Sequence, residues 1–157
     1  MRLMNFRRYG LLILATALLA IGPFAEAAIT PESDVLLPWF EIELENHDVG
    51  LSTTFSIVNA SPNDVKTRIT VYTNWGIPVL EVPVDFARTE AKTIDLRAWI
   101  AHGELPDRTL TPAELANLHA ALTGKPVDGL YYSSPFQEGV AVGYMVAQTL
   151  GDRPDSL

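Results

Sequence analysis

The sequence contains no cysteine among its 157 residues. Thiol nucleophiles, thiolate metal sites and dithiol redox motifs are therefore excluded. Disulfide bonds, which commonly reinforce small domains outside the cytoplasm, are excluded as well. A domain of this size must then derive its stability from packing or from a partner subunit.

Basic residues are scarce, with 11 lysines and arginines against 19 acidic residues and a net charge of −8. Nucleic acids and anionic membrane surfaces attract proteins through clustered Lys and Arg side chains. The acidic balance argues against both of these partners. It is compatible with a cation, with a basic partner or simply with solubility.

The longest apolar run, from Leu11 to Phe24, is shorter than the roughly 20 residues needed to cross a bilayer. It follows three arginines without an acid, and Ala25-Glu26-Ala27 comes after it. This order predicts a cleavable secretory signal peptide over residues 1–27, cut before Ala28. The mature protein is then periplasmic or secreted and has no membrane span. It keeps 130 residues, with 8 basic and 18 acidic side chains, which is enough for one domain.

Motifs with a defined chemistry are also lacking. His47, His102 and His119 do not stand at metal-ligand spacing from one another. The pair Ser133-Ser134 lacks the glycine context of a nucleophile elbow. We therefore expect no catalytic residue, no metal site and no cofactor, and the protein is expected not to be an enzyme.

The acidic residues offer two alternatives to this expectation. Glu41, Glu43 and Glu45 can gather calcium, but their alternate spacing is typical of a solvated strand face. A pair of carboxylates for glycoside hydrolysis is defined by distance in space and stays open. Asp85 and Asp95 lie in or next to predicted strands, although Asp95 alternates with apolar neighbours and should point outward.

Alternating apolar residues predict six β-strands. Their ranges are 35–45, 53–58, 65–73, 80–86, 93–96 and 140–148. We expect the first two strands to pair as a hairpin, because the segment between them has turn composition. Pro83 indicates that the fourth strand lies at an edge or contains a bulge.

One helix is predicted between the fifth and sixth strands. Thr111 is a candidate N-cap, Pro112 suits the first helical position, and Glu114 completes a capping box. Gly124 is a candidate C-cap. Residues 125–138 are predicted to be a loop, and residues 151–157 a disordered tail.

These elements favour a mainly β fold, an antiparallel immunoglobulin-like β-sandwich with one short inserted helix near residues 112–123. The domain is expected to span residues 28–150, with the last strand beside earlier strands and the helix over one end. A small open barrel is the alternative. A sandwich that ends soon after its last strand can also leave an edge open to a strand donated by a partner.

Several motifs resemble those of a group of uncharacterised secreted bacterial proteins with a single immunoglobulin-like, β-rich domain. They are Leu37-Pro38-Trp39-Phe40-Glu41, Thr53-Thr54-Phe55 leading to Asn59-Ala60-Ser61, Tyr72-Thr73-Asn74-Trp75-Gly76-Ile77-Pro78 and Thr93-Ile94-Asp95-Leu96-Arg97. The resemblance covers residues 36–97 and extends to Val142-Gly143-Tyr144, but not to the helix. It implies export and this fold, and it carries no functional residue with it.

Aromatic residues in turns are the candidate binding residues: Trp75, Tyr131, Tyr132 and Phe136. Large apolar side chains in such places either cap the end of the core or form an exposed binding patch. The sequence favours a non-enzymatic interaction or structural module that presents these loops to another exported protein. There are two alternatives. One is a small secreted carbohydrate-active hydrolase, and the other is a carbohydrate-binding module, which needs two or three coplanar aromatics on a sheet face.

Overall fold

The computed structural model describes residues 34–46 and 50–150. These residues all belong to one unit, Pro31–Leu157. The predicted signal peptide and its cleavage site, His47 and the predicted tail 151–157 lie outside the described residues. Those predictions stay predictions.

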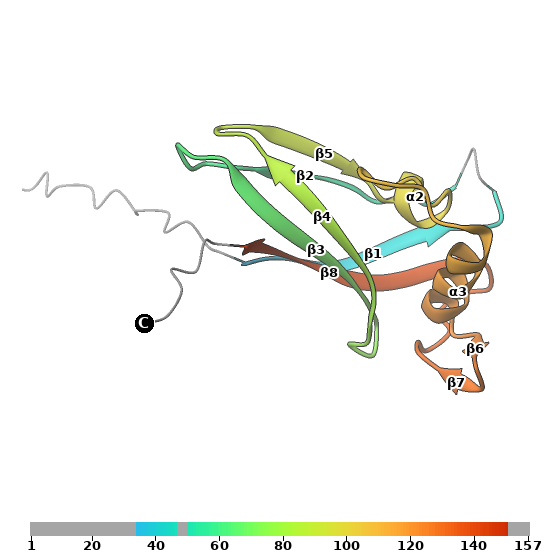
Figure 1. Ribbon diagram of the computed structural model, residues 1–157. Coiled ribbons are helices and arrows are strands. Elements are labelled where there is room, and N and C mark those ends of the chain that lie inside the picture. Colours follow the sequence, from blue (N-terminus) through green and yellow to red (C-terminus); the bar gives the residue numbers. More distant parts are fainter. Residues whose placement is uncertain (1–33, 47–49, 151–157) are drawn as a thin grey trace, which may run out of the picture. The chain divides into compact units, whose positions relative to one another are not determined.

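The larger layer is a four-stranded antiparallel sheet (Figure 1). In spatial order its strands are β1 (Asp34–Glu43), β8 (Val140–Leu150), β3 (Val65–Thr73) and β4 (Pro78–Phe86). The predicted alternation is confirmed, because Phe40 and Ile42 of β1 and Ile69 and Val71 of β3 are all buried. β4 lies at an edge of the sheet, as Pro83 predicts.

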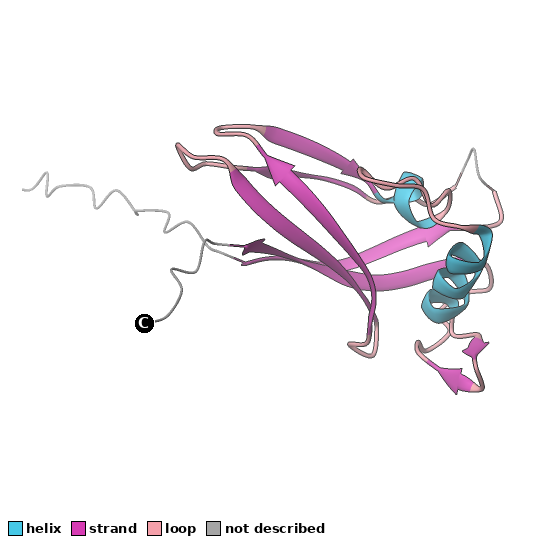
Figure 2. Ribbon diagram, viewed as in Figure 1, coloured by secondary structure: helices cyan, strands magenta, loops and turns pink. Residues whose placement is uncertain are grey.

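The smaller layer consists of β2 (Thr54–Val58) and β5 (Ala91–Asp95), paired antiparallel. The core lies between this layer and the four-stranded sheet, and it continues beneath the helices. Figure 2 shows the two groups of strands and both helices at the same end of the strands. Trp99, 5% exposed, is the tryptophan that packs in the core.

The predicted helix is confirmed as α3 (Pro112–Thr123). The Thr111 hydroxyl accepts the Glu114 N–H, the Glu114 carboxylate accepts the Thr111 N–H, and Gly124 ends the helix in the left-handed conformation. A second helix, α2 (Leu96–Ile100), was not expected. Asp95 begins it by accepting the Arg97 N–H at 2.9 Å.

The segment predicted as a plain loop contains a small hairpin. Its strands are β6 (Pro126–Val127) and β7 (Leu130–Tyr131), joined by Asp128 and Gly129 with φ values of +50° and +78°. Asp-Gly is a strong signal for a two-residue hairpin turn. The sequence therefore held the information needed to predict this hairpin.

The predicted hairpin between the first two strands is wrong. β1 pairs with β8, and β2 pairs with β5 in the other layer. The reason is burial: Val140, Ala141 and Val142 are at most 2% exposed, so β8 needs a neighbour on each side. This requirement places β8 in the centre of the sheet and separates β1 from β2, although the two are consecutive.

The predicted fold class is confirmed: the protein is mainly β, with antiparallel sheets in two layers and a helix inserted at the expected residues. Neither helix among residues 34–46 and 50–150 is long and apolar enough to cross a membrane.

Candidate functional site

Trp75 lies in the turn between β3 and β4, and its side chain is 56% exposed. The turn is held by Thr73, whose buried hydroxyl accepts the N–H groups of Trp75 at 3.3 Å and Ile77 at 3.2 Å. Gly76 takes the positive φ that the turn requires, +82°. The backbone is thus fixed while the indole ring faces solvent.

Asn74 joins this turn to the loop that carries Phe136. Its carboxamide oxygen accepts the Ser133 hydroxyl and the Ser134 N–H, each at 2.9 Å. Its amide nitrogen donates to the Ser134 carbonyl at 3.1 Å. Because Ser133 is fully buried, this contact is shielded from water. Two loops far apart in the sequence are therefore held side by side.

Phe136 makes an edge-to-face contact with Trp39 of β1, with ring centroids 5.8 Å apart and an interplanar angle of 74°. The two side chains are 56% and 44% exposed. The Trp39 indole N–H donates to the Glu41 carboxylate at 2.8 Å, which fixes the ring. Trp39 was not predicted as a site residue, although Phe40 points inward and its neighbour must therefore point outward.

Tyr72 and Tyr144 face each other across β3 and β8 on the outer side of the same sheet. Their rings stack with centroids 4.9 Å apart and planes 4° from parallel. The Tyr144 hydroxyl lies 3.4 Å from the position of a Cβ on Gly76, so the stack borders the Trp75 turn. We call the set Trp39, Tyr72, Trp75, Phe136 and Tyr144 the aromatic surface.

Tyr131 and Tyr132 do not share one environment. Tyr131, in β7, is 59% exposed, and its neighbour Leu130 is 62% exposed. Tyr132 is half-buried and lines a groove next to Pro78 and Val127. The structure thus associates Trp75 and Phe136 with one surface, leaves Tyr131 on a hairpin, and turns Tyr132 toward the groove.

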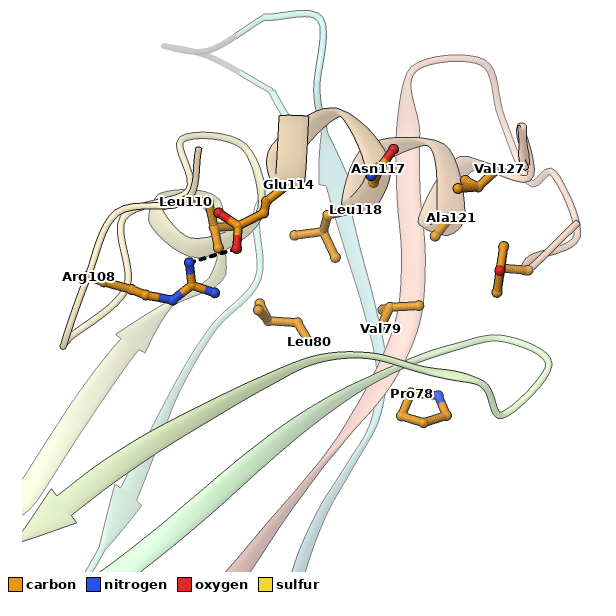
Figure 3. A pocket seen from close by; sticks show the side chains of 11 residues that line it. Pro78, Val79, Leu80, Arg108, Leu110, Glu114, Asn117, Leu118, Ala121 and Val127 are labelled. Carbon is orange, nitrogen blue, oxygen red and sulfur yellow. Dashed lines mark hydrogen bonds and ion pairs between the residues drawn. The ribbon is translucent and has the colours of Figure 1, made fainter. Parts of the chain in front are cut away.

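The groove lies between α3 and the first residues of β4 and has a volume of about 320 Å³ (Figure 3). Leu118 and Ala121 line it from the helix, and Val79 and Leu80 line it from the strand. Its walls are therefore mostly aliphatic. We call this feature the β4–α3 groove.

Glu114 is the acidic residue that lines the β4–α3 groove. Hydrogen bonds from the Thr111 backbone and then its hydroxyl, followed by one from Arg108 at 2.9 Å, lower the pKa of Glu114 to about 2. A carboxyl group that is ionised near neutral pH cannot act as a general acid there. Its role is to cap α3 and to hold Arg108 at the rim of the groove.

The other predicted candidates have structural roles. Asp95 caps α2 and is exposed, as expected from its outward position. His119 Nε2 lies 2.6 Å from the Ile100 carbonyl oxygen, which links the two helices. Within residues 34–46 and 50–150, no three His, Asp or Glu side chains are grouped so that they could hold a metal ion.

A second cleft, at the start of β3 and the end of β4, is lined by Asp64, Asp85 and Glu90. Two of these carboxylates are bonded to main-chain groups: Asp64 accepts the Arg88 N–H at 2.9 Å and Glu90 the Ala87 N–H at 2.7 Å. The glycoside-hydrolase alternative requires two carboxylates in a cleft, and Asp85 lines this one. Both hydrogen bonds hold main-chain N–H groups of the turn between β4 and β5, so these two carboxylates stabilise that turn.

No family model and no curated protein matches the chain. A solved structure, the Anabaena sensory rhodopsin transducer, is similar over 76% of this chain and 88% of its own, with 15% sequence identity and a TM-score of 0.43. A likeness at this level carries no argument about function. The molecule itself is an antiparallel β-sandwich with an exposed aromatic surface and a lateral groove.

Proposed function

We propose that the protein is an exported, non-enzymatic interaction module, and that its aromatic surface binds another exported protein. The exposure of Trp39, Trp75 and Phe136 on strands and loops with fixed backbones carries this proposal. Aromatic side chains are enriched among the residues that dominate protein–protein binding. The predicted signal peptide supports the export part of the proposal.

Rigidity supports the same conclusion. Thr73 fixes the Trp75 turn, Asn74 fastens this turn to the Phe136 loop, and Glu41 holds the Trp39 ring. A surface that is ordered before binding loses less conformational entropy when the partner arrives. Exposed aromatic rings on such a surface are therefore more favourable for binding than the same rings on mobile loops.

The ring geometry favours a protein over a sugar as the ligand. Carbohydrate platforms need two or three coplanar rings with open faces. Tyr72 and Tyr144 instead cover one another, with their planes 4° from parallel. Trp39 and Phe136 lie edge to face. An irregular arrangement of this kind suits the uneven surface of a protein.

Site-specific photocrosslinking in the native cells tests the proposal. A photoreactive phenylalanine derivative is placed at Trp75, and in a matched control at Arg88, an exposed residue in the β4–β5 turn. We expect one dominant exported protein to be crosslinked from position 75 and not from position 88. The Trp39→Ala variant should reduce the yield of that product at position 75 by about tenfold, as expected for a central aromatic residue.

Equal crosslinking from both positions would mean that the contacts are non-specific. Absence of any product at position 75, with the protein exported and folded, would contradict the proposal. Glycan-array binding that is lost in Trp75→Ala would instead support the carbohydrate-binding alternative.

A further inference from the structure

β4 has a free edge in the four-stranded sheet, because β3 is its neighbour on one side and no described strand of that sheet lies on the other. In an antiparallel ladder, alternate residues direct both main-chain polar groups toward the paired strand, and the residues between them direct theirs away. Lys92 of β5 donates to the Asp85 carbonyl at 2.6 Å, so this carbonyl points away from β3. The pairing of β3 and β4 is regular from Leu80 to Phe86. Glu81 and Pro83 therefore share the orientation of Asp85.

Part of this edge is blocked. Pro83 has no N–H group, and Lys92 occupies the carbonyl of Asp85. The N–H and carbonyl of Glu81 have no hydrogen-bond partner among residues 34–46 and 50–150. Of these three outward-facing residues, Glu81 is thus the one that offers both an N–H and a carbonyl, and the open part of the edge centres on it.

The open part of the edge lies beside the β4–α3 groove. Pro78, Val79 and Leu80 line the groove immediately before Glu81. Figure 3 shows these three residues on the strand, with Leu118 and Ala121 on the helix. Unpaired main-chain groups next to an aliphatic groove are the two elements of β-strand addition, in which hydrogen bonds give affinity and side-chain pockets give specificity.

We propose that the β4–α3 groove binds an extended segment of another protein, which pairs with β4 at Glu81 and inserts an aliphatic side chain between β4 and α3. The volume of about 320 Å³ and the aliphatic walls suit such a side chain. This site uses residues outside the aromatic surface, and it does not depend on the proposed function of that surface.

Charge defines the segment further. Glu81 is exposed and has no ion-pair partner among the described residues, whereas Glu114 is already paired with Arg108. Opposite charges on directly paired positions of neighbouring strands stabilise an antiparallel pair. The bound segment therefore carries Lys or Arg across from Glu81, next to its aliphatic residue.

The same charge argues against a second copy of this chain as the occupant. Symmetric pairing of two β4 strands would bring two Glu81 carboxylates close together, in two chains that each carry a net charge of −8. Like charges on opposed strand positions are destabilising. A different, basic chain avoids this repulsion.

Selection from a displayed library of random octapeptides on the immobilised protein tests the inference. We expect the enriched peptides to share an aliphatic residue and a Lys or Arg. Synthetic copies should shift the backbone amide signals of Glu81 and Ala121 in nuclear magnetic resonance spectra. Hydrogen exchange at the Glu81 amide should slow when the peptide is bound.

Two variants with matched controls locate the site. Glu81→Pro removes the free N–H without loss of a bond to β3 and should weaken peptide binding about tenfold, whereas Glu81→Gln keeps the N–H and should weaken it less. Asn117→Trp fills the groove from α3 and should abolish binding. Ala116→Trp, at an exposed neighbouring position on α3, should not.

Circular dichroism and thermal unfolding establish that each variant is folded. The inference is overturned if no peptide is enriched, or if the enriched peptides bind Glu81→Pro and Asn117→Trp as tightly as the wild type. It is also overturned if the protein dimerises through β4 and the Glu81 amide is protected only in the dimer. Crosslinking from Trp75 should persist in Glu81→Pro, which separates this test from that of the aromatic surface.

Discussion

The two edge strands of the four-stranded sheet, β1 and β4, differ in how their outward-facing main-chain groups are hydrogen-bonded. On β1, Glu41 exchanges hydrogen bonds with the Thr53 hydroxyl at 3.2 and 3.3 Å, and the Glu43 N–H donates to the Leu51 carbonyl at 3.0 Å. On β4, the main chain of Glu81 has no such partner among the described residues. Edge strands are usually covered or blocked, because free edges promote aggregation. The open part of the β4 edge lies beside the β4–α3 groove, where we propose that a partner strand pairs.

The central strand β8, which joins β1 to the β3–β4 pair, should give the largest effect when it is altered. A Cβ at Gly143 would overlap the Tyr72 carbonyl oxygen and lie 2.9 Å from the Phe40 ring. We expect Gly143→Val to lower the free energy of unfolding by at least about 3 kcal/mol in urea denaturation. Thr149→Ala, at an exposed position of the same strand, should change it by less than about 1 kcal/mol. Equal stabilities would mean that β8 does not hold this central position.

The contact between the two loops should give the next largest effect. Asn74→Ala removes three hydrogen bonds and leaves the buried Ser133 hydroxyl without that partner. We expect a loss of about 2–3 kcal/mol in unfolding free energy and a weaker crosslink from position 75. Asn63→Ala, an exposed asparagine in another turn, is the matched control and should change stability by less than about 0.5 kcal/mol. If amide relaxation shows that the Trp75 turn and the Phe136 loop stay rigid in Asn74→Ala, the role given to Asn74 is contradicted.

A single substitution can remove the hydrogen bonds that cover the β1 edge at Glu41. Thr53→Val keeps the side-chain shape but removes the hydroxyl that bonds the Glu41 N–H and carbonyl. We expect a loss of about 1 kcal/mol and faster hydrogen exchange at the Glu41 amide. Ser56→Ala, where an exposed hydroxyl bonds only Thr93, controls for the loss of a hydroxyl from a neighbouring strand. Unchanged exchange at Glu41 would show that Thr53 does not close this edge.

The smallest effect is expected at the rim of the β4–α3 groove. The pKa of Glu114 is about 2 in the folded protein, against an ordinary value of 4.5. A lowered pKa means that ionised Glu114 stabilises the fold at pH values above about 4.5, and that this contribution is lost as the pH falls from there to about 2. Wild type should therefore be more stable than Glu114→Gln at neutral pH, and the difference should vanish near pH 2. A difference that is independent of pH would contradict this assignment.

The parts of the fold that the sequence predicted depend on local signals. Thr111, Glu114 and Gly124 are sufficient to place α3, and Pro83 indicated an edge strand. The pairing of β1 with β8 was missed because strand order depends on which strand is buried on both sides, and not on proximity in the sequence. Turn composition alone therefore misled the assignment of the first hairpin.

The candidate site was predictable only in part, because Trp75 and Phe136 were named from the sequence whereas Trp39, Tyr72 and Tyr144 were not. The turn composition around Trp75 left both core capping and an exposed ring open, and the structure shows an exposed ring. The position of Trp39 next to Phe40 indicates that Trp39 also points outward. The bond between Asn74 and Ser133 joins residues far apart in the chain, and no local pattern predicts it. The β4–α3 groove requires the helix and the strand edge to meet, so its location became known only from the structure.

Amide hydrogen exchange of the free protein, measured residue by residue, tests the difference between the two edges most directly. The Glu81 amide should exchange almost as fast as in an unstructured peptide. The Val82 amide, directed toward β3, and the Glu41 amide, bonded to Thr53, should both be protected. Protection of Glu81 equal to that of Val82 in the monomeric protein would show that the β4 edge is already closed, and would contradict the account.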